Sequence, residues 1–152
     1  MRWEEAMALV AAEWEVFNLE TDGQGNCAIS LPDGGEIRLL AIAGSQLLLE
    51  GSLLGAASTA IRTPEPLLQL LTDNFAHAIT EGHVLAYQRE LDELVLVLSL
   101  DMAPLEEEEF SKKLESFRRD LDEMGRLMAS IFSQKPGREI FTNPFAIAGI
   151  PQ

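Results

Sequence analysis

The chain has 152 residues and a mass of 16.7 kDa, which suits one domain that buries about two thirds of the surface of its unfolded chain. Acidic side chains outnumber basic ones by 25 to 11, and the net charge is −14. This charge argues against nucleic acid and anionic membranes as partners, because both need basic patches. The single cysteine, Cys27, excludes an internal disulfide framework and a zinc site of the CxxC type.

The start of the sequence does not have the features of an export signal. It lacks the basic start and the apolar run of a signal peptide, and no apolar stretch approaches the roughly 18 residues that cross a bilayer. We therefore expect a soluble, cytoplasmic protein that does not insert into membranes.

The first predicted element is a helix over residues 2–18. Large apolar residues recur there at steps of four and three, which is the spacing of one helical stripe. They are Trp3, Met7, Val10, Trp14 and Phe17. A run of turn-forming residues, 22–26, then breaks the helical pattern.

Three strands are predicted after this turn, over residues 27–31, 37–41 and 46–52. Apolar residues alternate along the first two strands, and the third is rich in leucine. Short turns with glycine join the first strand to the second and the second to the third. Sequential strands with such short connections predict an antiparallel meander.

A second helix is predicted over residues 63–80, followed by strands over 83–88 and 94–100. A proline at the first helical position and a glycine just past the end mark the limits of the helix. Residues 94–98 are apolar on both faces of their strand. We therefore expect a helix or a second subunit to cover the second face of this strand.

The last helix is predicted from residue 104 to 132. The acidic run 106–109 suits its N-terminus, where the helix dipole favours negative charge. Apolar residues again step by four and three, and acid-before-base pairs four residues apart support the helix. The apolar residues are Phe110, Leu114, Phe117, Leu121, Met124, Met128 and Ile131.

Residues 1–132 are assigned to a single domain, and residues 133–152 form a tail with three prolines and no steady period. We expect the tail to be dispensable for folding. Its apolar side chains either rest in a partner-binding groove when no partner is present or reflect chance composition.

No cluster of residues in the sequence predicts catalysis, a metal site or a cofactor. The two histidines, His77 and His83, lie six residues apart, and we interpret each as a surface or half-buried structural residue. Cys27 alternates with apolar strand residues and is interpreted as a buried, inert thiol. The segment 20–31 has the alternating acids of a calcium loop, but Leu31 occupies the place of the bidentate glutamate. We therefore expect no enzyme, no metal and no cofactor.

The predicted order of elements is helix, three strands, helix, two strands, helix. Its most characteristic stretches are Asn26–Leu31, Leu47–Gly51 and Leu94–Leu100. With the small size and the acidity, they make residues 2–132 resemble the class I chaperones of bacterial type III secretion, the family that includes the Tir chaperone. The resemblance implies an α+β fold with an antiparallel sheet and three helices. The tail departs from it, being longer and more apolar than the usual short polar end.

The resemblance also implies a function and partners. It implies a homodimer in the bacterial cytoplasm that binds the N-terminal chaperone-binding segment of a secreted effector and keeps this segment extended and secretion-competent. No cofactor is implied, and the secretion ATPase is a further expected partner. Recognition of this kind combines strand addition with the filling of apolar pockets.

Two surfaces follow from the resemblance together with the apolar patterns. A groove beside the first helix is expected to bind the effector, since aromatic side chains are enriched at interfaces. The alternative is that the residues proposed for this groove simply fill the core. For Val10, this alternative is the stronger interpretation. The groove candidates are Val10, Trp14, Phe17, Ile29, Leu31, Leu39 and Leu48. The candidates for the dimer interface are Leu67, Leu68, Leu70, Leu71, Phe75, Val95 and Val97.

A second function remains open at this point. A stand-alone sensory or regulatory binding domain of the same fold, without a role in secretion, is the alternative, and an enzyme ranks third. Co-purification of an unfolded N-terminal fragment of an effector would discriminate between them.

Overall fold

The computed structural model describes residues 1–16, 19–32, 35–55 and 82–132, together with six single residues between 65 and 74. These six residues are helical; they are Glu65, Leu68, Gln69, Leu71, Thr72 and Asn74. The remainder of the predicted second helix, 63–80, and the tail, 133–152, lie outside the described residues.

Among the described residues, five antiparallel strands form one sheet in the order β1-β2-β3-β5-β4. The first three make the predicted meander, β5 returns beside β3, and β4 forms the far edge. All five predicted strands are thus confirmed, and β3 extends three residues beyond its predicted end. The strands are β1 (Cys27–Ser30), β2 (Glu36–Ile42), β3 (Gln46–Gly55), β4 (Val84–Gln88) and β5 (Glu93–Asp101).

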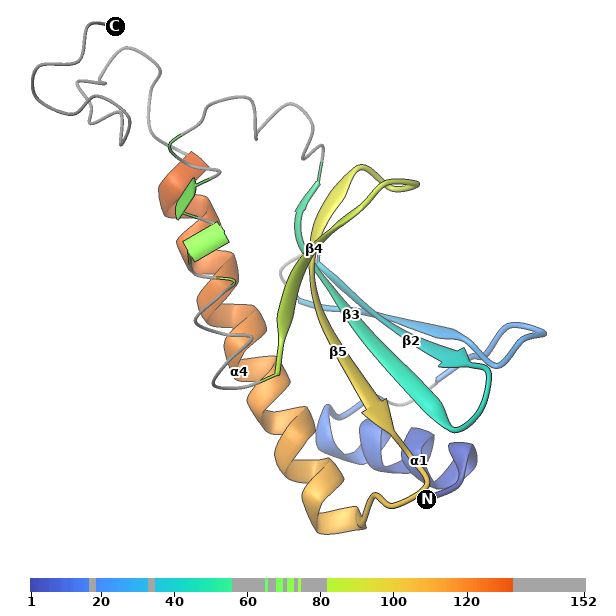
Figure 1. The fold of residues 1–152 in the computed structure, drawn as a ribbon. Coiled ribbons are helices and arrows are strands. Elements are labelled where there is room, and N and C mark those ends of the chain that lie inside the picture. The colour runs from blue at the N-terminus through green and yellow to red at the C-terminus, as the bar shows by residue number, and fades with distance from the viewer. Residues whose placement is uncertain are drawn as a thin grey trace, which may run out of the picture.

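Two helices with continuous described backbone, α1 (Trp3–Glu13) and α4 (Glu107–Phe132), lie on the same side of the sheet (Figure 1). The structure corrects the predicted end of the first helix, which was residue 18. Glu15 has a φ of 54°, and the Val16 amide donates to the Ala11 carbonyl at 2.9 Å, a bond that closes the last turn. Local turn geometry therefore ends α1 before the apolar spacing does.

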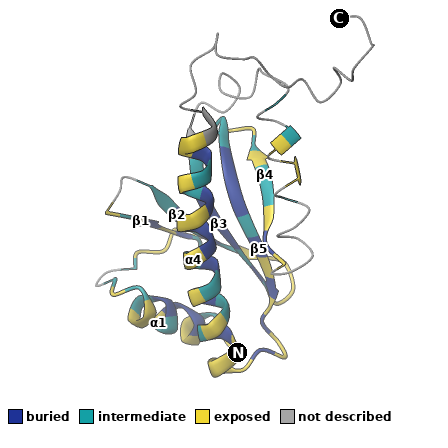
Figure 2. Cartoon of the chain, turned by 90° about the vertical axis from the view of Figure 1, so that its left-hand side faces the viewer, coloured by how far each residue is buried: buried dark blue, intermediate teal, exposed yellow. Residues whose placement is uncertain are grey.

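The hydrophobic core fills the space between these helices and one face of the sheet. Alternate strand residues point into it, and α4 presents a continuous buried stripe toward the sheet (Figure 2). The helix passes so close to β3 that a Cβ on Gly51 would lie 2.6 Å from Leu121 Cδ1. The members of the main core are Ala6, Met7, Val10, Cys27, Ile29, Ile37, Leu39, Leu47, Leu49, Leu96, Leu98, Leu100, Met102, Leu105, Phe110, Leu114, Phe117 and Leu121.

The predicted stripe of α4 is confirmed from Phe110 to Met128, all of whose apolar members are buried. The predicted stripe of α1 needs correction. Its buried residues are Ala6, Met7 and Val10, whereas both tryptophans are half-buried and pack against the border of the core. The small Ala6 brings α1 close to its neighbours, and the large indoles lie at the side of this contact.

Candidate partner-binding surface

The described part of the chain holds no group of three or more histidine, cysteine, aspartate or glutamate side chains placed to bind a metal ion. None of its helices is long and apolar enough to cross a membrane. The predicted burial of Cys27 is confirmed, with its Sγ 3.7 Å from Met7 Sδ. Burial raises the pKa of this thiol above its usual value, which favours the protonated, unreactive form.

The residues proposed for the groove occupy different parts of the fold. Val10, Ile29 and Leu39 are buried in the core, while Trp14 and Leu31 are half-buried at its border. Leu48 alternates with the buried Leu47 and Leu49 and therefore points to the opposite face of the sheet. Phe17 lies outside the described residues.

The structure thus leaves Trp14 and Leu31 half-buried against the core and places Leu48 on the opposite face of the sheet. Alternation along the strand could have shown from the sequence that Leu48 points to the face of the sheet opposite to that of Leu39. The groove as a whole remains a prediction.

The edge of the sheet at β1 is open over part of its length. β1 pairs with β2 on one side, and on the other side the described residues provide a single bridge, Thr21 to Cys27. The exposed residues Ala28 and Ser30 follow this bridge along the strand. An unpaired edge of this kind can receive an additional strand through main-chain hydrogen bonds.

The opposite edge, at β4, is engaged differently. Asn74 accepts a hydrogen bond from the Leu85 amide through its side-chain oxygen at 2.6 Å. This bond already occupies one donor of the β4 edge, while Val84 and Tyr87 expose apolar surface there. Each edge of the sheet thus has one such contact among the described residues, and the end of β1 at Ser30 lies beyond the contact on its edge.

A group of charged side chains lies on the sheet face that α1 and α4 leave uncovered. Arg38 donates from Nε to Glu50 Oε1 at 2.8 Å and from Nη2 to Glu93 Oε2 at 3.1 Å. The side chains of Arg38 and Glu50 are 14% and 6% exposed. Burial disfavours the charged guanidinium, but the hydrogen bonds and charges of Glu50 and Glu93 outweigh it and raise the pKa of Arg38. No local sequence pattern predicts this network, because it depends on the register between strands.

The residues proposed for a dimer interface are only partly described. Val95 is buried and Val97 half-buried, and both alternate with core residues and so face away from α4. Leu68 is half-buried and Leu71 is 54% exposed. Leu67, Leu70 and Phe75 lie outside the described residues.

His83 corrects a prediction, because it is fully buried instead of surface-exposed or half-buried. Its Nδ1 lies 2.6 Å from Asp120 Oδ2, and its ring packs edge-to-face on Phe117 with centroids 5.6 Å apart. The contact joins the residue before β4 to the middle of α4. His77 lies outside the described residues.

Comparison with known protein families places the chain. The profile of the Tir chaperone protein (CesT) family matches residues 8–123. The chain belongs to this family. The predicted family is therefore confirmed, and with it the expectation of a chaperone; the CesT family is a family of chaperones and not of enzymes.

Solved structures share the CesT fold seen here. They include the ExsC–ExsE complex (20% identity, TM-score 0.65, covering 82% of this chain and 91% of that chain) and the HopA1–SchA chaperone–effector complex (15%, 0.63, 82% and 93%). A third is the Yersinia pestis type III secretion chaperone SycH with a stable fragment of YscM2 (15%, 0.58, 81% and 99%). The sequence has no significant match among curated proteins.

Proposed function

We propose that this CesT-family protein is a type III secretion chaperone that binds the N-terminal segment of a secreted effector, the client, and keeps it extended. It would act in the bacterial cytoplasm as a homodimer and deliver the client to the secretion ATPase. Membership in a chaperone family supports the proposal, as do similar structures solved as chaperone–effector complexes. No residue of the described core or surface has to perform chemistry in this role.

The observation that carries the proposal is the open edge of β1 beside the border of the core. An extended client segment can add to the sheet here and bond its main chain to β1. Its apolar side chains would then approach Leu31, which directly follows β1, and Trp14; both are half-buried against the core. Main-chain bonds provide affinity for any extended sequence, and the apolar contacts select among clients.

Ser30 offers a specific test of strand addition. The Leu31 amide donates to the Gly35 carbonyl at 2.8 Å, so residue 31 bonds toward β2. Because bonding direction alternates along an antiparallel strand, the amide of Ser30 points away from β2. Ser30→Pro removes this outward donor and leaves the ladder with β2 intact, whereas Ser30→Ala keeps the donor.

The test is co-expression of the full chain with N-terminal segments of candidate secreted proteins, followed by pull-down and titration. We expect the parent and Ser30→Ala to bind the same client with equal affinity. Ser30→Pro should bind about tenfold more weakly, because the client loses one main-chain hydrogen bond to β1. Equal binding by Ser30→Pro, with unchanged circular dichroism, would place the client elsewhere; capture of no secreted protein would contradict the function itself.

A further inference from the structure

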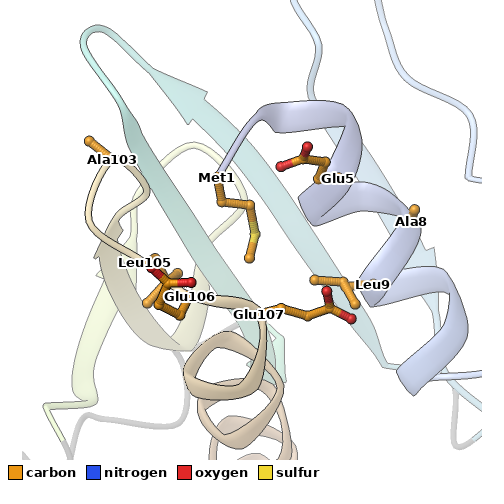
Figure 3. Close-up of a pocket in the computed structure, with 8 residues that line it drawn as sticks. All are labelled: Met1, Glu5, Ala8, Leu9, Ala103, Leu105, Glu106 and Glu107. Carbon is orange, nitrogen blue, oxygen red and sulfur yellow. The ribbon is translucent and has the colours of Figure 1, made fainter.

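A cleft separates the start of α1 from the start of α4, at the end of the molecule where the N-terminus lies (Figure 3). Its volume is about 520 Å³. Leu105 is buried at its base, and Met1 and Leu9 are half-buried, with the side chain of Leu9 beside that of Glu107. The lining residues are Met1, Glu5, Ala8, Leu9, Ala103, Leu105, Glu106 and Glu107.

Three glutamates and one positive group, the ammonium of Met1, are among the residues that line this cleft. Glu5 bonds to Arg2, and the Met1 ammonium donates to the Met102 carbonyl at 2.9 Å. In the described part of the chain, no lysine or arginine forms an ion pair with Glu106 or Glu107, whereas the adjacent Glu108 pairs with Lys112, one helical turn further along. The helix dipole favours acidic residues in the first turn of α4 and can explain why they are there. It does not explain the apolar cleft between these residues and α1.

We propose that this cleft binds a peptide segment in which an apolar side chain lies next to lysine or arginine. The apolar side chain would contact Leu9 and Leu105, and the basic head group would approach the carboxylates of Glu106 and Glu107. Long basic side chains suit such a site because their methylene stems bury against apolar surface while the charge stays at the rim. The assignment of this segment to the client rests on the proposed function; the chemistry of the cleft does not.

The probe is a fluorescent peptide that alternates leucine and lysine, titrated with the full chain at low ionic strength and followed by anisotropy. Glu106→Gln/Glu107→Gln should weaken binding about tenfold, the effect of removing two partly exposed charge contacts. Glu115→Gln/Glu123→Gln makes the same change in net charge on exposed positions of α4 outside the cleft, and should bind as the parent does. A peptide with glutamate in place of lysine should not bind.

A second pair of variants tests the cleft without changing charge. Ala8 is exposed on the cleft wall, and Ala8→Phe should fill the space and weaken peptide binding by about tenfold. Ala129→Phe adds the same ring to an exposed position near the other end of α4 and should leave binding unchanged. If circular dichroism shows that Ala8→Phe is unfolded, Ala103→Phe on the facing wall takes its place.

The outcomes separate the two proposals. The cleft is not the peptide site if the phenylalanine variants of the cleft bind the peptide as well as the parent does. Equal losses from both charge variants, or binding of the glutamate peptide, would also overturn it. A client captured normally by the cleft variants would overturn the assignment of the segment to the client and leave the function standing. Peptide binding without any client would support the cleft and contradict the function.

Discussion

Arg38 and Asp120 are ionisable residues whose side chains are largely buried, and distant parts of the chain supply partners for both. Arg38 on β2 meets Glu50 of β3 and Glu93 of β5. Asp120 of α4 meets His83, with both side chains buried. Removal of one partner from a buried pair is costly because the other polar group stays in an apolar environment without compensation.

The His83–Asp120 contact leads to a prediction of stability. His83→Leu should lower the free energy of unfolding by about 3 kcal/mol, because, among the described residues, it leaves the buried Asp120 with only a longer contact, 3.7 Å to the exposed Arg119. His83→Leu/Asp120→Leu should recover part of this loss, as two apolar side chains replace the pair. The measurement is urea unfolding followed by circular dichroism at neutral pH.

An exposed carboxylate on the same helix provides the control. The carboxylate of Asp122 lies 3.6 Å from Arg118 Nε at the surface. Asp122→Asn should lower the free energy of unfolding by no more than about 0.5 kcal/mol. If the effects of the two leucine substitutions simply add, the pair does not couple in the way that its geometry indicates.

At the scale of elements, α4 determines how closely the helical layer approaches the sheet. Its apolar residues at steps of four and three cover β3 and β5, and Gly51 of β3 leaves room for Leu121. A side chain at position 51 would separate the two elements or displace Leu121. The glycine in the middle of a strand, usually unfavourable, is explained by this close approach.

Two glycines with opposite surroundings test this packing. Gly51→Ala should destabilise the protein by about 1–3 kcal/mol, because its Cβ would overlap Leu121. Gly125→Ala, in α4 with no atom within 4 Å of the added Cβ, should instead stabilise it by about 0.5–1 kcal/mol. Thermal unfolding of both variants provides the comparison, and a stable Gly51→Ala would show that β3 and α4 are less tightly packed than the structure indicates.

For the whole molecule, the main asymmetry is between the two faces of the sheet. One face is covered by α1 and α4 (Figure 1). The other face carries the Arg38 network and the apolar side chains of Val95 and Val97. Leu71 and Val84 are 54% and 42% exposed. Association with a partner would remove these apolar side chains from water.

We predict that two copies of the chain associate and that Leu71 and Val97 contribute to the interface. Light scattering at micromolar concentration should give about twice the 16.7 kDa of one chain. Leu71→Glu should shift the mass toward one chain, because a buried charge without a partner opposes association. Leu91→Glu is the matched control, since Leu91 is a similarly exposed leucine in the β4–β5 turn. A parent mass of one chain would contradict the prediction.

The strands, the alternation of apolar residues along them, the apolar stripe of α4 and the family could all be predicted from the sequence alone. These properties are local, because alternation along a strand and steps of four and three along a helix require no knowledge of distant residues. The burial of Cys27 could be predicted for the same reason. Much of the chaperone interpretation therefore needed no tertiary structure.

Tertiary structure decided which of these apolar residues remain near the surface. Val10 and Trp14 share the predicted stripe, but only Val10 is buried, because Glu15 and Val16 end α1 and the helix meets its neighbours through Ala6. The His83–Asp120 pair and the cleft between the starts of α1 and α4 join residues that no local pattern relates. Their positions depend on how helices pack across a sheet, which is determined by contacts between residues far apart in the chain.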